Sequence, residues 1–143
     1  MTHLAEVLAI ESACLAGVTD EAKLTSWRCR VVEELMKPRS PYALALRQTG
    51  DVADRADFLD QWCGLIEEAV NRLLRANATA GTSRSVTHAT GDDVDPHTTS
   101  VMILAALHGG SALSQVAQDP WPLNAALDLA LAPLCSGRGR QPR

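Results

Sequence analysis

The chain has 143 residues, of which 46% are hydrophobic and 21% are charged, and its formal net charge is −4. This composition is typical of one soluble globular domain and excludes a mainly disordered chain. The acidic balance also disfavours nucleic-acid binding by this chain alone, because phosphate recognition needs a basic face. Aromatic residues make up only 3%, and Ala and Leu, which favour helices, dominate the apolar set. We therefore predict an all-α helical bundle.

The sequence contains neither a clear membrane span nor a secretory signal. Its longest uninterrupted apolar run, Val101 to Leu107, is shorter than the roughly 20 residues that a membrane-spanning helix needs. The first residues lack the basic region and apolar block of a signal peptide. Four cysteines stand far apart in apolar patterns, so we expect buried thiols rather than disulfides or a zinc site: Cys14, Cys29, Cys63 and Cys135. These features predict a cytoplasmic protein without membrane contact.

Two helices are predicted in the N-terminal third. Apolar residues recur at helical spacing from His3 to Leu15, and Gly17 favours a helix end there. Thr19 is the predicted N-cap of the second helix, because acidic residues follow it in the first turn. Apolar residues at steps of three and four then extend this helix to about Lys37.

The centre of the chain combines a proline turn with the most amphipathic stretch of the sequence. Pro38 and Pro41 remove backbone donors, so the chain turns there before a short helix or turn from Tyr42 to Leu46. An apolar stripe begins near Asp54 and continues to Leu74, which predicts a long amphipathic helix. From Asn77 to Val94 the composition changes to small polar residues, and we expect a flexible loop.

Two further helices are predicted after this loop. Each begins with an Asp-Pro pair, at Asp95 and at Asp119, which places an acidic N-cap before a proline in the first turn. The first of them is apolar on nearly all sides from Val101 to Val116, so it must be covered on more than one side. Residues 136–143 are expected to form a flexible tail, which leaves residues 1–135 as one helical domain.

Gly109 and Gly110 stand in the middle of this apolar helix. A glycine inside a helix is destabilising by about 1 kcal/mol relative to alanine, so a compensating close contact is expected. Together with nearby alanines, the pair forms a surface of small residues that another helix can approach closely. That helix belongs either to the core of the same chain or to a second subunit, and the sequence leaves both possibilities open.

Large apolar residues from separate segments are candidates for a ligand cavity: Trp27, Tyr42, Phe58, Trp62 and Met102. Taken singly, each residue is more typical of a packed core. No paired carboxylates at a suggestive spacing accompany them. We therefore expect no enzymatic activity and no cofactor.

A carboxylate-rich stretch is the one feature that would suggest metal chemistry. His88 and His97 flank Asp92, Asp93 and Asp95, but their spacing matches neither an EF-hand loop nor a standard zinc site. A solvated loop that ends in a helix cap explains the stretch more simply. A small metal-dependent helical enzyme is therefore kept only as the weaker alternative.

From Asp95 to Leu134 the sequence reads DPHTTSVMILAALHGGSALSQVAQDPWPLNAALDLALAPL. This run resembles the last two helices of TetR-like transcriptional repressors. Residues Ser40 to Leu44 lie where relatives often carry a Cys-Pro turn, and the helix from Phe58 to Arg75 is similar to their long central helix. The resemblance covers nearly the whole chain, but only to the ligand-sensing and dimerising domain of that family. It rests on patterns of small and apolar residues.

The resemblance implies a homodimer joined through the last two helices, with a hydrophobic effector pocket in each subunit. We expect the following residues to line the pocket: Trp27, Val31, Tyr42, Phe58, Trp62, Ile66 and Met102. We expect the following residues to form the dimer interface: Ala105, His108, Gly109, Ala112, Leu113, Leu123, Leu127 and Leu131. Such a pocket favours an apolar or aromatic small molecule. The family's helix-turn-helix has no counterpart in the sequence, so DNA binding is expected only through a segment absent from this chain.

The leading hypothesis is therefore the effector-sensing and dimerising domain of a TetR-like transcriptional regulator. Such a domain works by differential affinity: the effector binds one arrangement of the bundle more tightly than another. The alternative is a dimeric helical interaction module that binds no small molecule. A tightly filled bundle interior would favour this alternative.

Overall fold

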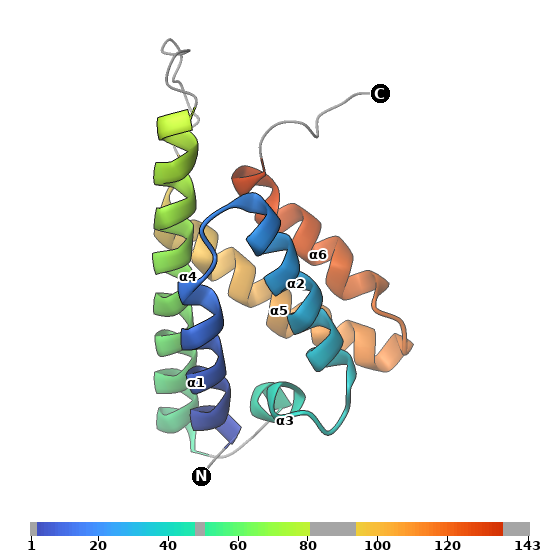
Figure 1. Cartoon of the computed structure of the whole chain (residues 1–143). Helices are drawn as coiled ribbons and strands as arrows, with labels where there is room; N and C mark the ends of the chain where they lie inside the picture. Colours follow the sequence, from blue (N-terminus) through green and yellow to red (C-terminus); the bar gives the residue numbers. More distant parts are fainter. Residues whose placement is uncertain (1–2, 48–50, 81–93, 136–143) are drawn as a thin grey trace.

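The computed structural model describes residues 3–47, 51–80 and 94–135, and all regular structure in these ranges is helical (Figure 1). The elements are α1 (His3–Ala16), α2 (Glu21–Met36), α3 (Pro41–Arg47), α4 (Val52–Ala80), α5 (Pro96–Ala117), α6 (Trp121–Leu131) and a 3₁₀ turn, η1 (Ala132–Leu134). No strand occurs within these ranges, which confirms the all-α prediction.

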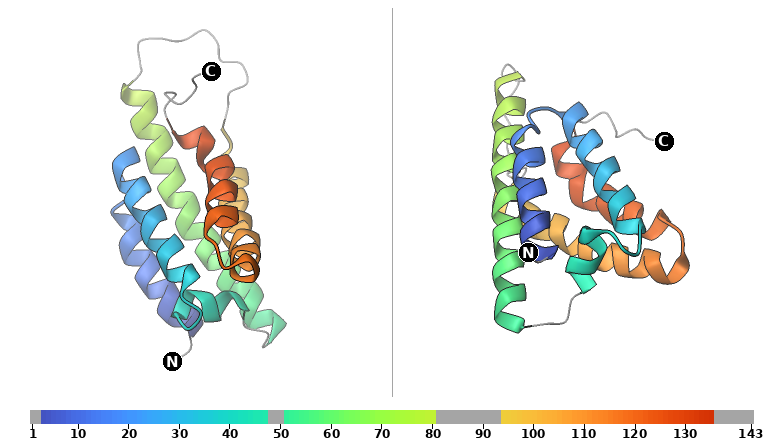
Figure 2. Two further views of the ribbon diagram at one scale, coloured as in Figure 1. Left: turned by 90° about the vertical axis from the view of Figure 1, so that its right-hand side faces the viewer. Right: turned by 60° about the horizontal axis from the view of Figure 1, so that its bottom comes forward.

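The helices form two packed pairs that meet where α4 contacts α5, with α2 and α3 packed against both pairs or one of them. Helix α1 runs alongside the long helix α4, and α6 runs back along α5 (Figures 1 and 2). Helix α2 lies between the pairs: it packs on α5, and its Arg28 side chain forms an ion pair of 2.7 Å with Asp128 on α6. The short helix α3 packs against α1 and α2 at the lower end of the bundle in Figure 1.

Helix α4 is longer than the sequence pattern predicted. It continues through Ala80, so the first residues of the predicted loop are helical. The rest of that loop up to residue 93, and the predicted tail at 136–143, lie outside the described residues.

The capping prediction is confirmed at α5 and corrected at α2. The Asp95 carboxylate accepts a hydrogen bond from the Thr98 backbone N–H at 3.0 Å, which is the predicted N-cap. At α2 the N-cap is Asp20 rather than Thr19, and its carboxylate accepts from the Lys23 N–H at 2.8 Å. The acidic residue that was placed in the first turn is therefore the cap itself.

The start of α6 also differs from the prediction. Pro120 holds the N-cap position and has no side-chain acceptor to offer. The Asp119 carboxylate accepts from the Trp121 N–H at 3.0 Å, and the buried Ser114 hydroxyl on α5 accepts from the Leu123 N–H at 2.9 Å. A side chain of the preceding helix thus accepts a hydrogen bond from a free backbone N–H group in the first turn of α6, and this bond fixes the corner between the two helices.

The contact between α5 and α6 depends on Gly110. A Cβ atom at this position would lie 2.9 Å from Leu123 Cα and 3.1 Å from Leu123 Cδ1, closer than packed atoms allow. Gly109 differs, because a Cβ atom there would meet no described atom within 4 Å. Packing within the chain therefore explains the second glycine of the pair and leaves the first unexplained.

The cysteine prediction is correct only for Cys63, which is buried. Cys14 is partly buried, whereas Cys29 and Cys135 are exposed. Cys29 lies on a side of α2 that faces away from the core, and Cys135 follows the last helical turn in an extended conformation.

Helix α5 alone among the described helices is long and apolar enough to cross a membrane by length and composition. This is weak evidence for a span, because the core helix of a soluble protein passes the same test. In this bundle α5 packs against α2, α4 and α6, and it buries Ser100 and Ser114 completely.

Replacing Gly110 with alanine should destabilise the chain by about 1–3 kcal/mol, because the new methyl group collides with the backbone of α6. Gly64 is a matched control: it is exposed inside α4, and a Cβ atom there would meet no described atom within 4 Å. Gly64→Ala should stabilise the chain by up to about 1 kcal/mol through helix propensity. Urea denaturation measures both changes, and equal stabilities of the two variants would contradict the close α5–α6 contact.

Candidate functional site

The structure brings together six of the seven residues that were predicted to line a pocket. These six residues are almost completely buried and belong to one hydrophobic core cluster: Trp27, Val31, Tyr42, Phe58, Trp62 and Ile66. Met102 does not join them, because it lies on the outer side of α5 with 52% of its surface exposed. The prediction of a shared site is therefore wrong for Met102.

The centre of this cluster is a carboxylate that the sequence analysis did not single out. Glu11 on α1 is fully buried. Its Oε1 atom accepts from the indole Nε1 of Trp27 at 3.0 Å and of Trp62 at 2.9 Å. Its Oε2 atom accepts from the Tyr42 hydroxyl at 2.6 Å and from the Arg30 guanidinium at 3.0 Å. One side chain thus joins α1, α2, α3 and α4, and we call these five residues the Glu11 cluster.

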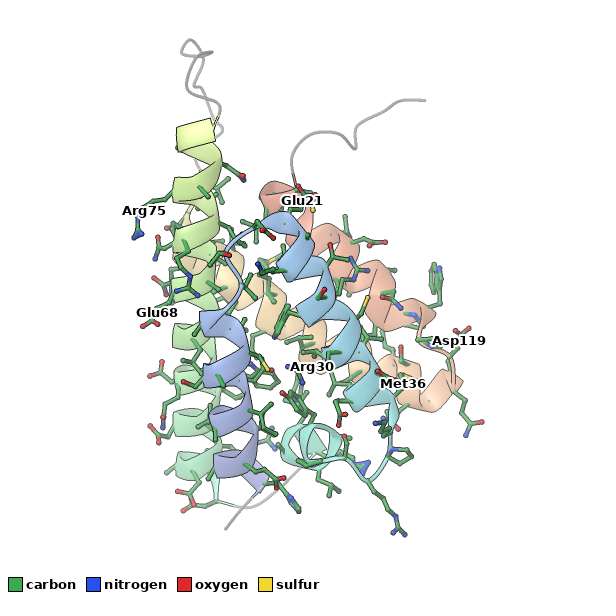
Figure 3. The ribbon with its side chains drawn as sticks, in the orientation of Figure 1. Glu21, Arg30, Met36, Glu68, Arg75 and Asp119 are labelled. Atoms are coloured by element: carbon green, nitrogen blue, oxygen red, sulfur yellow. The ribbon has the colours of Figure 1, made fainter. Side chains whose placement is uncertain are left out.

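Arg30 connects the Glu11 cluster to the surface. Its guanidinium also donates to the Tyr42 hydroxyl at 3.2 Å and lies 5.7 Å from the centre of the Tyr42 ring. The side chain is 34% exposed, and it lies between α2 and α3 near the middle of the bundle (Figure 3). The buried carboxylate therefore has a cation as its partner, and that cation keeps part of its hydration.

The aromatic rings fill the space around Glu11. Trp62 meets Tyr42 edge-on with ring centres 6.0 Å apart, and it meets Phe58 at 5.5 Å. Because the rings contact one another and the indole N–H groups are bonded to Glu11, these residues act as a packed and hydrogen-bonded core.

Burial raises the pKa of the Tyr42 phenol well above its usual value, and the charge of Glu11 and the hydrogen bond to it raise this pKa further. The ionised phenolate would face the carboxylate in a site with little water. The protonated phenol is therefore the form that the fold stabilises.

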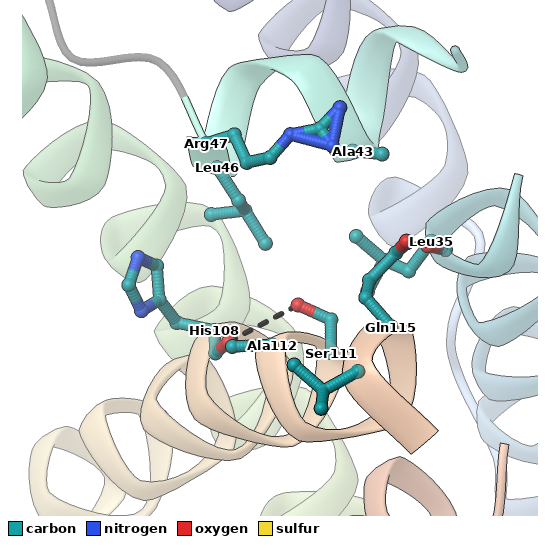
Figure 4. Close-up of a pocket in the computed structure, with 9 residues that line it drawn as sticks. Leu35, Ala43, Leu46, Arg47, His108, Ser111, Ala112 and Gln115 are labelled. Carbon is teal, nitrogen blue, oxygen red and sulfur yellow. Dashed lines mark hydrogen bonds between the residues drawn. The ribbon is translucent and has the colours of Figure 1, made fainter. Parts of the chain in front are cut away.

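A cavity lies elsewhere, between α2, α3 and α5. Its volume is about 270 Å³. The lining residues are Leu35, Ala43, Leu46, Arg47, His108, Ser111, Ala112, Gln115 and Val116. Figure 4 shows Leu46 pointing into this space from α3, with His108 and Arg47 on two of its sides. None of the seven predicted pocket residues lines it, but His108 and Ala112 were predicted to lie in the dimer interface.

Three polar side chains of this α2–α3–α5 cavity donate hydrogen bonds to backbone carbonyls. The Ser111 hydroxyl donates to the His108 carbonyl at 3.1 Å, and the Gln115 amide donates to the Leu35 carbonyl at 2.6 Å. Arg47 donates to the Pro38 carbonyl at 3.0 Å, which fixes its guanidinium beside α3. The cavity therefore combines apolar walls with a cation and an imidazole, a pattern typical of small-molecule sites.

Helix α5 leaves an apolar stripe exposed. Val101, Met102, Leu113 and Val116 are 45%, 52%, 63% and 86% exposed. Between them on the same side of the helix lie three small exposed residues, Ala105, Gly109 and Ala112. We call these seven residues the α5 stripe. Five of the eight residues predicted for the dimer interface lie on it or beside it: Ala105, His108, Gly109, Ala112 and Leu113.

The other three predicted interface residues are placed differently. Leu123, Leu127 and Leu131 are at most 3% exposed and pack into the core of their own chain. The prediction that they face a partner is wrong, because the apolar side of α6 is already covered by α5. The outer side of α6 instead exposes Trp121 and Leu129.

The carboxylate-rich stretch is only partly described. His88, Asp92 and Asp93 lie outside the described residues. Asp95 serves as the N-cap of α5, and the His97 ring forms a contact of 3.0 Å with Glu67 on α4. This contact raises the pKa of His97, mainly through the hydrogen bond to the Glu67 carboxylate. Within the described ranges no three His, Cys, Asp or Glu side chains are grouped as a metal site requires.

Comparisons with protein-family models, with curated proteins and with solved structures find no match for this chain.

Replacing Glu11 with glutamine should destabilise the fold by about 2–4 kcal/mol. The amide keeps an acceptor for the two indoles but removes the charge that faces Arg30 and leaves one acceptor fewer for the donors around it. Glu6 on the same helix is exposed, so Glu6→Gln should change stability by no more than about 0.5 kcal/mol. Urea denaturation followed by tryptophan fluorescence measures both values. A Glu11→Gln variant as stable as Glu6→Gln would show that the cluster does not hold the helices together.

Tyr42 is the only tyrosine of the chain, so its ionisation is measurable by ultraviolet absorbance. Free tyrosine ionises near pH of about 10. Because the folded-state pKa is raised, this group stabilises the fold fully below the unfolded pKa, and the contribution is lost as pH rises toward the folded pKa. We expect no tyrosinate signal at pH of about 10 while circular dichroism still reports folded protein. Tyrosinate absorbance with the ordinary midpoint in a folded chain would contradict the buried Tyr42–Glu11 contact.

Proposed function

We propose that this chain is the effector-sensing and dimerising domain of a TetR-like transcriptional regulator, most simply a cytoplasmic repressor. The observation that carries the proposal is Gly109, a mid-helix glycine in an apolar stripe that the chain itself leaves uncovered. DNA binding in this proposal belongs to a segment outside this chain.

Gly109 has no packing partner within the described chain to explain it. It is exposed, and the space above it is open, although an alanine there would stabilise the helix. The same helix exposes large apolar side chains on this side, and a soluble monomer gains nothing from leaving them in water. Both features have one explanation if a second helix packs across α5 at Gly109.

A second copy of this chain is the simplest source of that helix. In a dimer with twofold symmetry the same patch serves both subunits, so α5 would pack against its own counterpart. The spacing of Ala105, Gly109 and Ala112 places small residues at the centre of the stripe, where two backbones can approach closely. Met102 lies on one side of this centre, and Leu113 and Val116 lie on the other, so each subunit supplies large side chains to flank the crossing point.

The sensing part of the proposal is supported by the α2–α3–α5 cavity. Ala112 and Val116 line the cavity and also belong to the α5 stripe. A molecule in the cavity would therefore contact the helix that joins the subunits. An effector that binds more tightly to one position of α5 than to another would shift the spacing of the two subunits.

A dimeric interaction module without a small-molecule ligand remains the second candidate. The observation that favours it is the filled interior: the residues first expected to form a pocket pack on one another and on Glu11. The two candidates share the dimer and differ in the use of the cavity.

Replacing Gly109 with leucine should raise the dimer dissociation constant at least about tenfold, because the side chain would separate the two helices at their closest point. Gly64→Leu is the matched control, since Gly64 is also an exposed, open mid-helix glycine. Sedimentation velocity over a concentration series measures both constants, and circular dichroism confirms that both variants fold. If the two variants associate equally, the proposed interface is wrong; if the unmodified chain stays monomeric, the dimerising function is wrong as well.

A further inference from the structure

We propose that the α2–α3–α5 cavity binds a small apolar molecule that carries a carboxylate, with Arg47 and His108 as its polar contacts. This inference rests on the proposed function, and it names both the effector class and the position of the site.

The walls determine the apolar part of the ligand. Leu35 comes from α2, Leu46 from α3, and Ala112 and Val116 come from α5, so three helices contribute aliphatic carbon. An apolar protein cavity of about 150 Å³ holds one benzene ring. The volume of about 270 Å³ therefore suits a molecule of roughly two fused rings. A larger ligand would have to displace Leu46, which points into the space (Figure 4).

The charges determine the polar part. Among the described lining residues one side chain is a permanent cation, Arg47, and none is acidic. Within the described ranges no ion pair holds Arg47, and its contact with the Pro38 carbonyl orients it without neutralising its charge. A guanidinium presents its N–H donors in a geometry that matches a carboxylate.

His108 supplies a second donor on another side of the same space (Figure 4). Its backbone carbonyl accepts from the Ser111 hydroxyl, and its ring stands at one side of the cavity (Figure 4). One of the two amide N–H groups of Gln115 is bonded to the Leu35 carbonyl, and Arg47 and His108 add further N–H donors from other sides of the cavity. A carboxylate accepts from both, and because Arg47 is exposed, its gain over a neutral molecule is a charge-assisted hydrogen bond to a solvated guanidinium.

The test compares two probes that differ in charge alone. Naphthoate has a fused two-ring body and a carboxylate, and naphthamide has the same body with a neutral amide. Isothermal titration calorimetry at low salt measures the affinity of both probes for the unmodified chain. We expect naphthoate to bind at least about tenfold more tightly than naphthamide.

Two arginine variants locate the site. Arg47→Gln removes the proposed contact, and Arg39→Gln is the matched control, because Arg39 is exposed in the turn before α3 and does not line the cavity. Both variants change the net charge equally, so a difference between them reports position rather than overall charge. We expect Arg47→Gln to weaken naphthoate binding about tenfold and to leave naphthamide binding unchanged, with Arg39→Gln close to the unmodified chain.

Each outcome decides a different point. Equal affinities for the two probes, or equal effects of the two arginine variants, would overturn the carboxylate inference and leave small-molecule sensing in place. If neither probe binds at millimolar concentration, the cavity as an effector site is wrong, and the dimeric interaction module is favoured. The dimer itself is judged separately by Gly109→Leu, so failure of the ligand inference is distinguishable from failure of the dimer.

Discussion

The buried carboxylate of Glu11 is the interaction on which the arrangement of the first four helices depends. A charge in the core is costly unless donors surround it, and here donors come from α2, α3 and α4. Removal of any one of these helices would leave the carboxylate with unmet hydrogen-bonding capacity. Apolar contacts alone allow one helix to slide along another. Four directional hydrogen bonds to the two carboxylate oxygens allow little such sliding. The cluster therefore fixes the relative positions of helices that hydrophobic burial only holds together.

Much of the fold could be predicted from the sequence, because helical periodicity and proline are local signals. The elements from α1 to α6 follow the apolar spacing, and the Asp95 cap lies where the Asp-Pro pair predicted it. The cap of α6 could not be predicted in this way, because its acceptor, Ser114, comes from another helix. The start of the predicted loop was wrong for a related reason: the residues from Asn77 to Ala80 continue an existing helix, and composition alone does not reveal this.

The candidate site was only half accessible to sequence reasoning. The aromatic residues were found because large apolar side chains from separate segments tend to meet in a core. Glu11 was missed because a glutamate on a helix is normally solvated. Its position gave a signal nonetheless: Val7, Glu11 and Leu15 follow one another at steps of four, and all three are buried. The prediction that Leu123 and Leu127 lie in the dimer interface was wrong for a different reason. A periodic apolar stripe does not show whether its partner helix lies in the same chain.

Two adjacent glycines of α5 lie on different sides of the helix. Gly110 permits the approach of α6 within the chain, and Gly109 lies on the open side. The contacts of α5 differ in how firmly they are held: α6 is fixed by close packing and by Ser114, and Gln115 bonds α5 to α2 beside the cavity, while the α5 stripe is left exposed in the described chain. The Glu11 cluster makes the opposite wall rigid. In the proposed sensor an effector would therefore act against helices α2 and α3, which the Glu11 cluster holds, and a displacement of α5 would have to loosen its Gln115–Leu35 bond. A displacement of α5 carries α6 with it and changes the surface offered to a second subunit, which is the movement that a dimeric regulator needs.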